Sequence, residues 1–386
     1  MPSYFKPSDS EAWYYRIPAP YLQESAFYTT FIAPAARPSD PTRGRYPLPF
    51  SPTESVIRDN PRFRVQDRRI FLNAGKTEWI FYQVLEDKQA IKQHKRNADF
   101  IHCHGINDYG GKFTEHAISF LEAGYRLVLP DLPAHGRSTG LHAHVDNMET
   151  LVDALDAVVC DVMMCDHSEG VIDAELDARK RFIAGSSMGG FTALSYLIQY
   201  STAPAIDAAR SDGIRKMENG LKRPTIDGAL LLCPMLAISP ETRPSLLVEY
   251  IARAIASFAG RWPLAEANRG KNTDDPIKAE EFEADPQTYS GKLRIATGLS
   301  ILRGITNVNA RLSEVTVPFK VFHGTGDRVT NHRGSQRLYE QASSQDKEIQ
   351  LYDGQQHVLL KVGRDEEDDK KRQRVLKDML DWLEKH

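Results

Sequence analysis

The chain has 386 residues, of which 41% are hydrophobic and 26% are charged, so it can bury a large core and is not a disordered protein. Its 49 Lys and Arg residues nearly balance its 52 Asp and Glu residues, and the formal charge of −3 argues against a general nucleic-acid-binding protein. Residues 1–10 have no apolar core, and the apolar run 229–238 is too short to cross a bilayer. We therefore expect neither a secretory signal nor a membrane span.

The cysteine content gives no sign of a disulfide framework or a zinc site. The chain has four cysteines, and Cys160 and Cys165 have no second pair or nearby histidine that would complete a set of zinc ligands. Free thiols are typical of a reducing compartment, so we expect a cytoplasmic protein that holds no metal.

Half of the chain's prolines lie in residues 1–62, together with several tyrosines and Trp13. Proline at this density excludes long helices and central strands. We predict that residues 1–62 form an arm that lies against the body of the protein.

From residue 63 onward, short apolar runs alternate with helix-length stretches. This alternation predicts βαβ units, and so an α/β fold with a mostly parallel central sheet flanked by helices. The predicted strands are Glu78–Leu85, Asp99–Cys103, Tyr125–Leu129, Arg181–Ala184, Ala229–Leu232, Phe319–Phe322 and Glu348–Tyr352, and the predicted helices include Asn147–Val162, Gly190–Tyr200, His332–Ala342 and Arg364–Lys385.

Two segments interrupt this alternation of predicted strands and helices. Residues 201–226 are polar and contain Pro and Gly, which indicates a surface insertion. Residues 239–312 separate two strands by far more than one crossover helix requires, so we predict a helical cap there. The core then comprises residues 63–238 and 313–386.

A G-x-S-x-G sequence at residues 185–189 places Ser187 in the turn between a predicted strand and a predicted helix. This context is required for a serine nucleophile, because the tight turn exposes the hydroxyl and the small residues let the two backbones approach. Ser138 lies in a second G-x-S-x-G match without this context, and Ser186 has Ala184 rather than glycine two residues before it. Ser187 is the predicted nucleophile.

A serine hydroxyl needs a base that is oriented by an acid, and with this type of turn the chain order is Ser, then Asp or Glu, then His. His357 follows the predicted strand 348–352 through a short loop, where such a base is expected. His323 lies within a strand, His332 begins a helix and His386 ends the chain. Asp327, at the end of the strand 319–322, is the predicted acid, and Asp353 is a rival that has the character of a turn residue.

The oxyanion formed in such a reaction needs two backbone N–H donors. One is predicted at Met188, directly after the nucleophile. The other is predicted at Ile106, in the loop that follows the strand 99–103, because Gly105 lets the chain turn toward the site.

Taken together, these residues resemble the monoacylglycerol lipase family of α/β-hydrolases, which is grouped with serine aminopeptidase-like hydrolases. The resemblance covers roughly residues 65–385. It rests on His104-Gly105, the loop 131–138, the turn 187–190, Cys233–Leu236, Asp285-Pro286 with Leu293 and Gly298, the segment 317–327 and Gly354–Leu359. The chain departs from the usual family pattern at Ser186, Asp108, Lys112 and Leu360.

Within the predicted cap, apolar residues recur with helical spacing between a candidate N-cap, Ser245, and Gly260. One interpretation is a buried core helix. The other is a lid that lines an acyl pocket and contacts a membrane or lipid droplet, with Leu247, Ile251 and Ile255 as substrate-binding residues.

The resemblance and the predicted triad imply a serine ester hydrolase that cleaves monoacylglycerols or similar acyl esters without a cofactor. A broad carboxylesterase or lysophospholipase and an acyltransferase are alternatives on the same fold. An aminopeptidase-like enzyme should carry acidic groups for a substrate ammonium, and Asp108 is a candidate. A non-enzymatic binding protein would not require the triad.

Overall fold

The computed structural model describes residues 41–170, 179–201, 223–265 and 271–386. Their centre is an eight-stranded sheet with the strand order β1-β2-β4-β3-β5-β6-β9-β10. The first two pairings, β1 with β2 and β2 with β4, are antiparallel, and the other five are parallel. The strands are β1 (Arg64–Phe71), β2 (Trp79–Glu86), β3 (Ala98–Cys103), β4 (Arg126–Pro130), β5 (Lys180–Ser186), β6 (Gly228–Leu232), β9 (Phe319–Gly324) and β10 (Lys347–Tyr352).

The seven strands that the sequence predicts are confirmed, with ends that differ by at most two residues. The inner strands β3, β4 and β6 are buried along their whole length, as expected for strands covered on both faces. Strand β1 is an addition to the predicted set. It is rich in arginine and lies at an edge of the sheet, where alternate residues stay exposed, so it has no apolar run.

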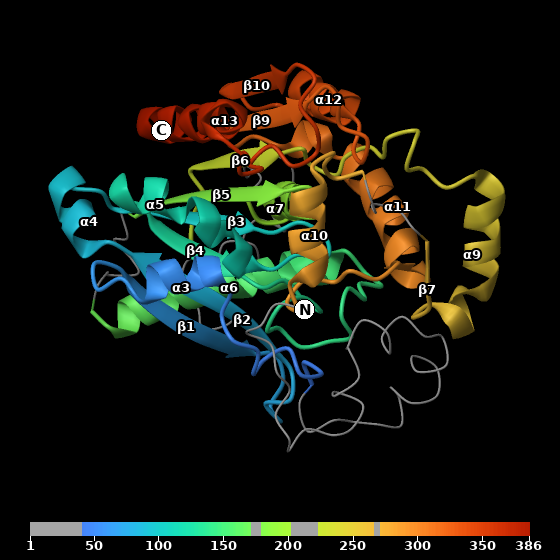
Figure 1. The fold of residues 1–386 in the computed structure, drawn as a ribbon, viewed down its shortest axis with the longest axis horizontal. Helices are drawn as coiled ribbons and strands as arrows, with labels where there is room; N and C mark the ends of the chain where they lie inside the picture. The colour runs from blue at the N-terminus through green and yellow to red at the C-terminus, as the bar shows by residue number, and fades with distance from the viewer. Residues whose placement is uncertain (1–40, 171–178, 202–222, 266–270) are drawn as a thin grey trace.

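Two layers of helices cover the sheet (Figure 1). One hydrophobic core lies between the sheet and α6, α7 and α12, and the other lies between the sheet and α3, α5 and α13. Neighbouring strand residues divide between the two cores, as Phe100 and Ile101 do, because successive side chains point to opposite faces. The helices are α3 (Pro52–Arg58), α4 (Lys88–His94), α5 (Thr114–Glu122), α6 (Glu149–Ser168), α7 (Met188–Tyr200), α12 (His332–Gln341) and α13 (Glu366–Lys385).

Between β6 and β9 the chain forms a separate set of elements: α9 (Leu246–Ala259), β7 (Pro263–Ala265), α10 (Pro276–Ala284), β8 (Leu293–Arg294) and α11 (Ile295–Asn309). Helix α11 is fixed to the body by Thr297 and Ser300, whose hydroxyls donate hydrogen bonds to the carbonyls of Ala143 and Val145. Helix α9 lies at the periphery (Figure 1).

The predicted helix α9 is present and begins after Ser245, whose hydroxyl accepts a hydrogen bond from the Val248 amide. Gly260, which follows the last residue of α9 and caps it, has a φ of −54°, a right-handed conformation rather than the left-handed one expected of a terminating glycine. Only Ala259 of this helix is buried. The interpretation of α9 as a buried core helix is therefore wrong.

Part of the predicted N-terminal arm is described. Residues 41–62 contain α3 and pack on the body, where the buried guanidinium of Arg45 donates hydrogen bonds to the carbonyls of Gly136, Ser138 and Gly140. Residues 1–40 of that arm, and 202–222 of the predicted insertion, lie outside the described residues. Within the described ranges, every helix is too short or too polar to span a bilayer.

Candidate active site

Ser187 occupies a strained turn between β5 and α7. Its φ of 55° and ψ of −112° lie outside the regions that non-glycine residues favour. The flanking residues must be glycines, because neighbouring backbone atoms lie too close for a side chain. A Cβ on Gly185 would lie 2.3 Å from the backbone of Gly189, and one on Gly189 would lie 2.0 Å from the carbonyl oxygen of Cys103. This is the strand–turn–helix context that the sequence predicts for Ser187.

The loops after β9 and β10 bring the predicted acid and base together. Nδ1 of His357 lies 2.7 Å from Oδ2 of Asp327, a short hydrogen bond to a carboxylate. The bond leaves Nε2 as the ring nitrogen available to a serine hydroxyl. Ser187 and His357 line the same cavity, which has a volume of about 660 Å³.

The carboxyl group of Asp327 is fully buried and densely hydrogen-bonded. Its Oδ1 accepts from the amides of Val329 and Thr330, and its Oδ2 accepts from the Thr330 hydroxyl as well as from His357. Burial by itself would raise the pKa of Asp327, but the charge interaction with His357 and the hydrogen bonds from the neighbouring histidines outweigh it. The pKa therefore lies well below its usual range.

The two predicted oxyanion donors come from segments that are in contact. Met188 is the first residue of α7, so its N–H has no acceptor within the helix. Ile106 lines the cavity in the loop after β3, and a Cβ on the neighbouring Gly105 would lie 3.6 Å from Cβ of Ser187. His104 holds this loop in place, because its Nε2 accepts a hydrogen bond from the Leu132 amide and its Nδ1 lies 2.7 Å from the Gly105 carbonyl.

The three predicted substrate-binding residues are not part of the cavity wall. Leu247 and Ile251 are 68% and 49% exposed on α9, and Ile255 on the same helix is also outside the lining. The wall is instead formed by the loop after β3, by α10 with the segment 285–293, and by the loop after His357. A contact between α9 and substrate stays a prediction, which would require the helix to move toward the cavity.

The rival residues have other roles. Ser138 is fully buried, donates to the Asp131 carbonyl and accepts from the Phe81 amide, which makes it a structural residue. Asp353 accepts a hydrogen bond from the Thr325 hydroxyl, and His386 lies 2.9 Å from a carboxylate oxygen of Asp346. His332 is the first residue of α12.

His323 is the residue that sequence reasoning missed. Its place within a strand argues against a role as the base, yet its Nε2 lies 3.2 Å from Oδ2 of Asp327 and its Nδ1 lies 2.7 Å from the Ser335 hydroxyl. Burial lowers the pKa of His323, so the ring is neutral and donates one N–H. The Ser335 hydroxyl then donates to Nδ1, and the Nε2–H is directed at Asp327. The signal in the sequence is that His323 and Asp327 are four residues apart, one before and one after the end of β9.

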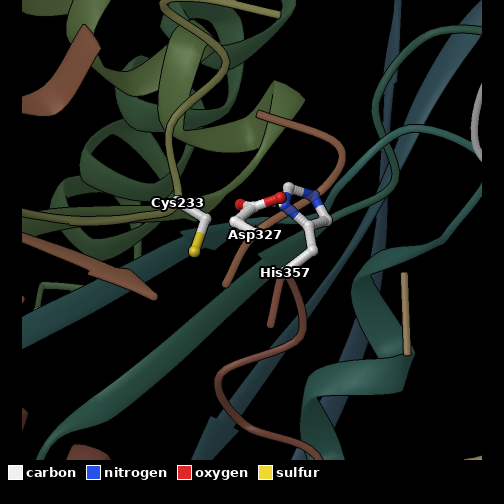
Figure 2. Close-up of side chains that lie close together, drawn as sticks. All are labelled: Cys233, Asp327 and His357. Atoms are coloured by element: carbon white, nitrogen blue, oxygen red, sulfur yellow. Dashed lines mark hydrogen bonds and ion pairs between the residues drawn. The ribbon is translucent and has the colours of Figure 1, made fainter. Parts of the chain in front are cut away.

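Cys233 lies on the side of Asp327 opposite His357 (Figure 2). Among the described residues, Cys233, Asp327 and His357 each place one possible metal-ligand atom within 4.8 Å of the others. Two features oppose a metal site. Burial raises the pKa of the Cys233 thiol, which disfavours the thiolate that a metal requires, and the Asp327 oxygens are already hydrogen-bonded to protein donors. The donor set therefore fits proton transfer better than metal binding.

A polar network joins the loop after β3 to the segment between β6 and β9. Lys112 Nζ lies 3.2 Å from Oδ2 of Asp285, and the buried Tyr109 hydroxyl donates to the same oxygen. Asp108 faces the cavity in this loop. Desolvation raises the pKa of Asp108 to about 7, although the charge of Lys112 opposes the shift.

The sheet order, the Ser187 turn and the order of the site residues along the chain define an α/β-hydrolase. The family model described as serine aminopeptidase, S33, matches residues 94–209 and 213–362, and the chain belongs to this family. Its relatives are esterases and lipases, and it is a carboxylic ester hydrolase.

Two curated relatives and one solved structure illustrate the similarity. The caffeoylshikimate esterase of Arabidopsis thaliana is 30% identical over 284 residues, which cover 73% of this chain and 76% of the relative. The monoglyceride lipase of Mus musculus is 25% identical over 264 residues, or 66% and 74% of the two chains. A soluble variant of the Saccharomyces cerevisiae monoglyceride lipase, solved with a substrate analog, shares the fold with a TM-score of 0.64 and 19% identity, over 88% of this chain and 98% of that chain.

We predict that His323→Leu lowers kcat about tenfold with little change in KM, because a hydrogen bond to a charged group contributes about 1.5 kcal/mol. The hydrogen bond from His323 helps to hold the pKa of Asp327 below its usual range. Without this donor the carboxylate is protonated at a higher pH than in the wild type, so the acidic limb of the kcat/KM profile moves to higher pH.

The matched control is His332→Gln, since His332 packs edge-on against His323 at 6.3 Å and lies at the start of α12. It should leave both rate and profile unchanged, whereas His323→Gln, which keeps an N–H donor, should recover part of the rate. A slower His323→Leu enzyme with an unmoved pH profile would show that His323 supports only the fold.

Proposed function

We propose that the protein is a serine hydrolase that cleaves monoacylglycerols or similar acyl esters through an acyl-enzyme on Ser187. The observation that carries this proposal is the 2.7 Å hydrogen bond between His357 and Asp327 beside a cavity that also contains Ser187 in its strained turn. The similarity to proteins named monoglyceride lipase supports the substrate class.

In the proposed reaction, Nε2 of His357 takes the proton from the Ser187 hydroxyl as the oxygen attacks the ester carbonyl. The resulting oxyanion accepts hydrogen bonds from the amides of Met188 and Ile106. His357 then gives its proton to the leaving alcohol, and the acyl group remains on Ser187. Water attacks this acyl-enzyme with His357 again as base, which releases the acid and restores the serine.

The family description includes aminopeptidases, but the state of Asp108, the acidic residue predicted to hold a substrate ammonium, favours a neutral ester. An aminopeptidase needs a negative group to hold the substrate ammonium. The Asp108 carboxyl has a pKa raised to about 7, so it is only partly ionised at neutral pH, and the Lys112 ammonium nearby opposes a second cation. Asp285 is engaged by Lys112 and Tyr109.

Monoesters should fit this site better than esters with several acyl chains, because α10 and the segment 285–293 form part of the wall and leave a cavity of about 660 Å³. Each buried methylene contributes about 0.8 kcal/mol, so a medium acyl chain should bind much better than a short one.

We therefore predict faster release of fatty acid from a monoacylglycerol than from the di- or triacylglycerol of the same acid. The measurement compares initial rates at equal ester concentration in the same detergent. Ser187→Ala should abolish activity on all three esters, which attributes the rates to this site. A preference for the triester would contradict the proposed substrate class.

Helix α9 supports a further part of the proposal, contact with a lipid surface. Its exposed residues form an apolar surface at the periphery of the molecule. In the proposed reaction an apolar acyl chain has to enter the cavity, and such a chain comes from lipid. A formal charge of −3 gives no general attraction to anionic lipid, so apolar contact would supply the affinity. The most exposed members are Leu246 (76%), Tyr250 (73%), Leu247 (68%) and Phe258 (67%).

We predict that Leu246→Ser combined with Leu247→Ser weakens binding to phosphatidylcholine vesicles in a flotation assay by about tenfold or more, since two large apolar side chains contribute roughly 1.5 kcal/mol each. Hydrolysis of a short, soluble ester should be unchanged. The control is Val56→Ser on α3, where an isolated valine is 60% exposed. Equal vesicle binding by the double variant and the wild type would reject a membrane role for α9.

A further inference from the structure

The loop that carries the proposed base leaves the sheet at its edge. His357 follows β10, which lies at one end of the strand order and pairs with β9. The first part of this loop rests on the turn after β9, because the Gly326 amide donates to the Gln355 carbonyl and the Gly354 amide donates to the Thr325 hydroxyl. These hydrogen bonds end at Gln355, and different ones hold the residues on either side of His357.

The residues that flank His357 are bonded to the segment directly before α10. After the histidine, the Val358 amide donates to the Asn272 carbonyl at 3.4 Å. Before it, the Gln356 side chain is held at both of its polar atoms. Its Oε1 accepts from the Asp274 amide at 2.7 Å, and its Nε2 donates to Oδ2 of the Asp274 carboxylate. Both flanks of the base are thus tied to the part of the chain between β6 and β9.

The Asp274 carboxylate also reaches the loop of the proposed acid. Its Oδ1 forms an ion pair with the guanidinium of Arg328, the residue directly after Asp327. One carboxylate therefore bridges the neighbour of the acid and the neighbour of the base. The Asp274 and Arg328 side chains are 66% and 34% exposed, and an exposed ion pair contributes little to the stability of a fold. Its loss should therefore change the geometry of the site more than the stability of the protein.

A second link, through Asp275, keeps α10 in place independently of Asp274. Oδ1 of the buried Asp275 side chain accepts from two amides in the first turn of α10, and its Oδ2 lies 3.2 Å from Nζ of Lys361 in the loop after His357. Helix α10, which lines the cavity, thus stays anchored when the Asp274 side chain is removed. Substrate binding and the position of the base can therefore be separated by experiment.

We propose that Asp274 is a positioning residue that holds the imidazole of His357 in line with Ser187. It acts through Gln356 on the base loop and Arg328 on the acid loop. This inference rests on the proposed function, because it takes the roles of the acid and the base from it. The imidazole must reach first the serine hydroxyl and then the leaving oxygen, and displacements of about 1 Å in such a geometry slow catalysis strongly. A loop released from Asp274 should therefore lower kcat and leave the cavity intact.

The test measures hydrolysis of octanoylglycerol by the wild type, Asp274→Ala and Asp274→Asn. We expect kcat to fall about tenfold in Asp274→Ala, with KM and Tm equal to those of the wild type. The rate at which a fluorophosphonate labels Ser187 should fall by a similar factor, since this reaction also requires the imidazole to be in place. Asp274→Asn keeps a side-chain oxygen for one of the two partners and should recover part of the rate.

Arg328→Gln should cost less than Asp274→Ala, and its addition to Asp274→Ala should cause no further loss, because both changes break the same bridge. The matched control is Asp381→Asn, which removes an exposed ion pair with Lys377 on α13 and should keep the wild-type kinetics.

An unchanged kcat in Asp274→Ala would overturn the inference. A lower kcat accompanied by a lower Tm or a raised KM would overturn it as well, because it would assign Asp274 a structural role. The proposed function has a separate test in His357→Ala, which should be inactive on octanoylglycerol. Wild-type activity in that variant, or none in the wild type, would refute the proposed function itself.

Discussion

A buried carboxylate is the feature on which the rest of the site depends. Removing the ionised Asp327 side chain from water costs several kcal/mol unless donors replace the lost hydration. The chain supplies them from three sources: the backbone of the turn after β9, the Thr330 hydroxyl, and the two histidines His323 and His357. Because these donors come from the ends of adjacent parallel strands and the loops that follow, the carboxylate fixes the imidazole of His357 at the edge of the sheet where Ser187 emerges.

The same edge of the sheet contains the strained turn at Ser187, which contacts with neighbouring segments keep in place. Ser187 keeps an unfavourable backbone conformation because its amide donates to the Leu232 carbonyl and its carbonyl accepts from Met235, which ties the turn to the end of β6. The contacts of Gly185 and Gly189 leave no room for a side chain at either position. The turn is thereby fixed before substrate arrives, as electrostatic stabilisation of an oxyanion by backbone amides requires.

Much of this arrangement could be predicted from the sequence. The buried strands are continuous apolar runs, and the order Ser187, Asp327, His357 follows from where each residue stands after a strand. Strand β1 could not be found in this way, since an arginine-rich edge strand has no apolar period. The residues of the cavity wall could not be predicted from the sequence. The apolar pattern of α9 indicates an amphipathic helix, but it does not indicate which way the apolar face points. In the structure, α10 and the segment 285–293 line the cavity in place of the predicted Leu247, Ile251 and Ile255. The contact between His323 and Asp327 could not be predicted either, because a histidine in a strand has partners that are known only once the neighbouring strand ends are placed.

The central claim is that Ser187 is a nucleophile activated by His357 and Asp327. Labelling with a fluorophosphonate, followed by peptide mass spectrometry, tests it most directly. We predict a single adduct on Ser187 in the wild type, no adduct in Ser187→Ala, and labelling of Asp327→Asn that is slower on the order of 10³-fold or more, because the amide would hold the imidazole in the wrong tautomer. An adduct on another residue, or an undiminished labelling rate in Asp327→Asn, would contradict the account.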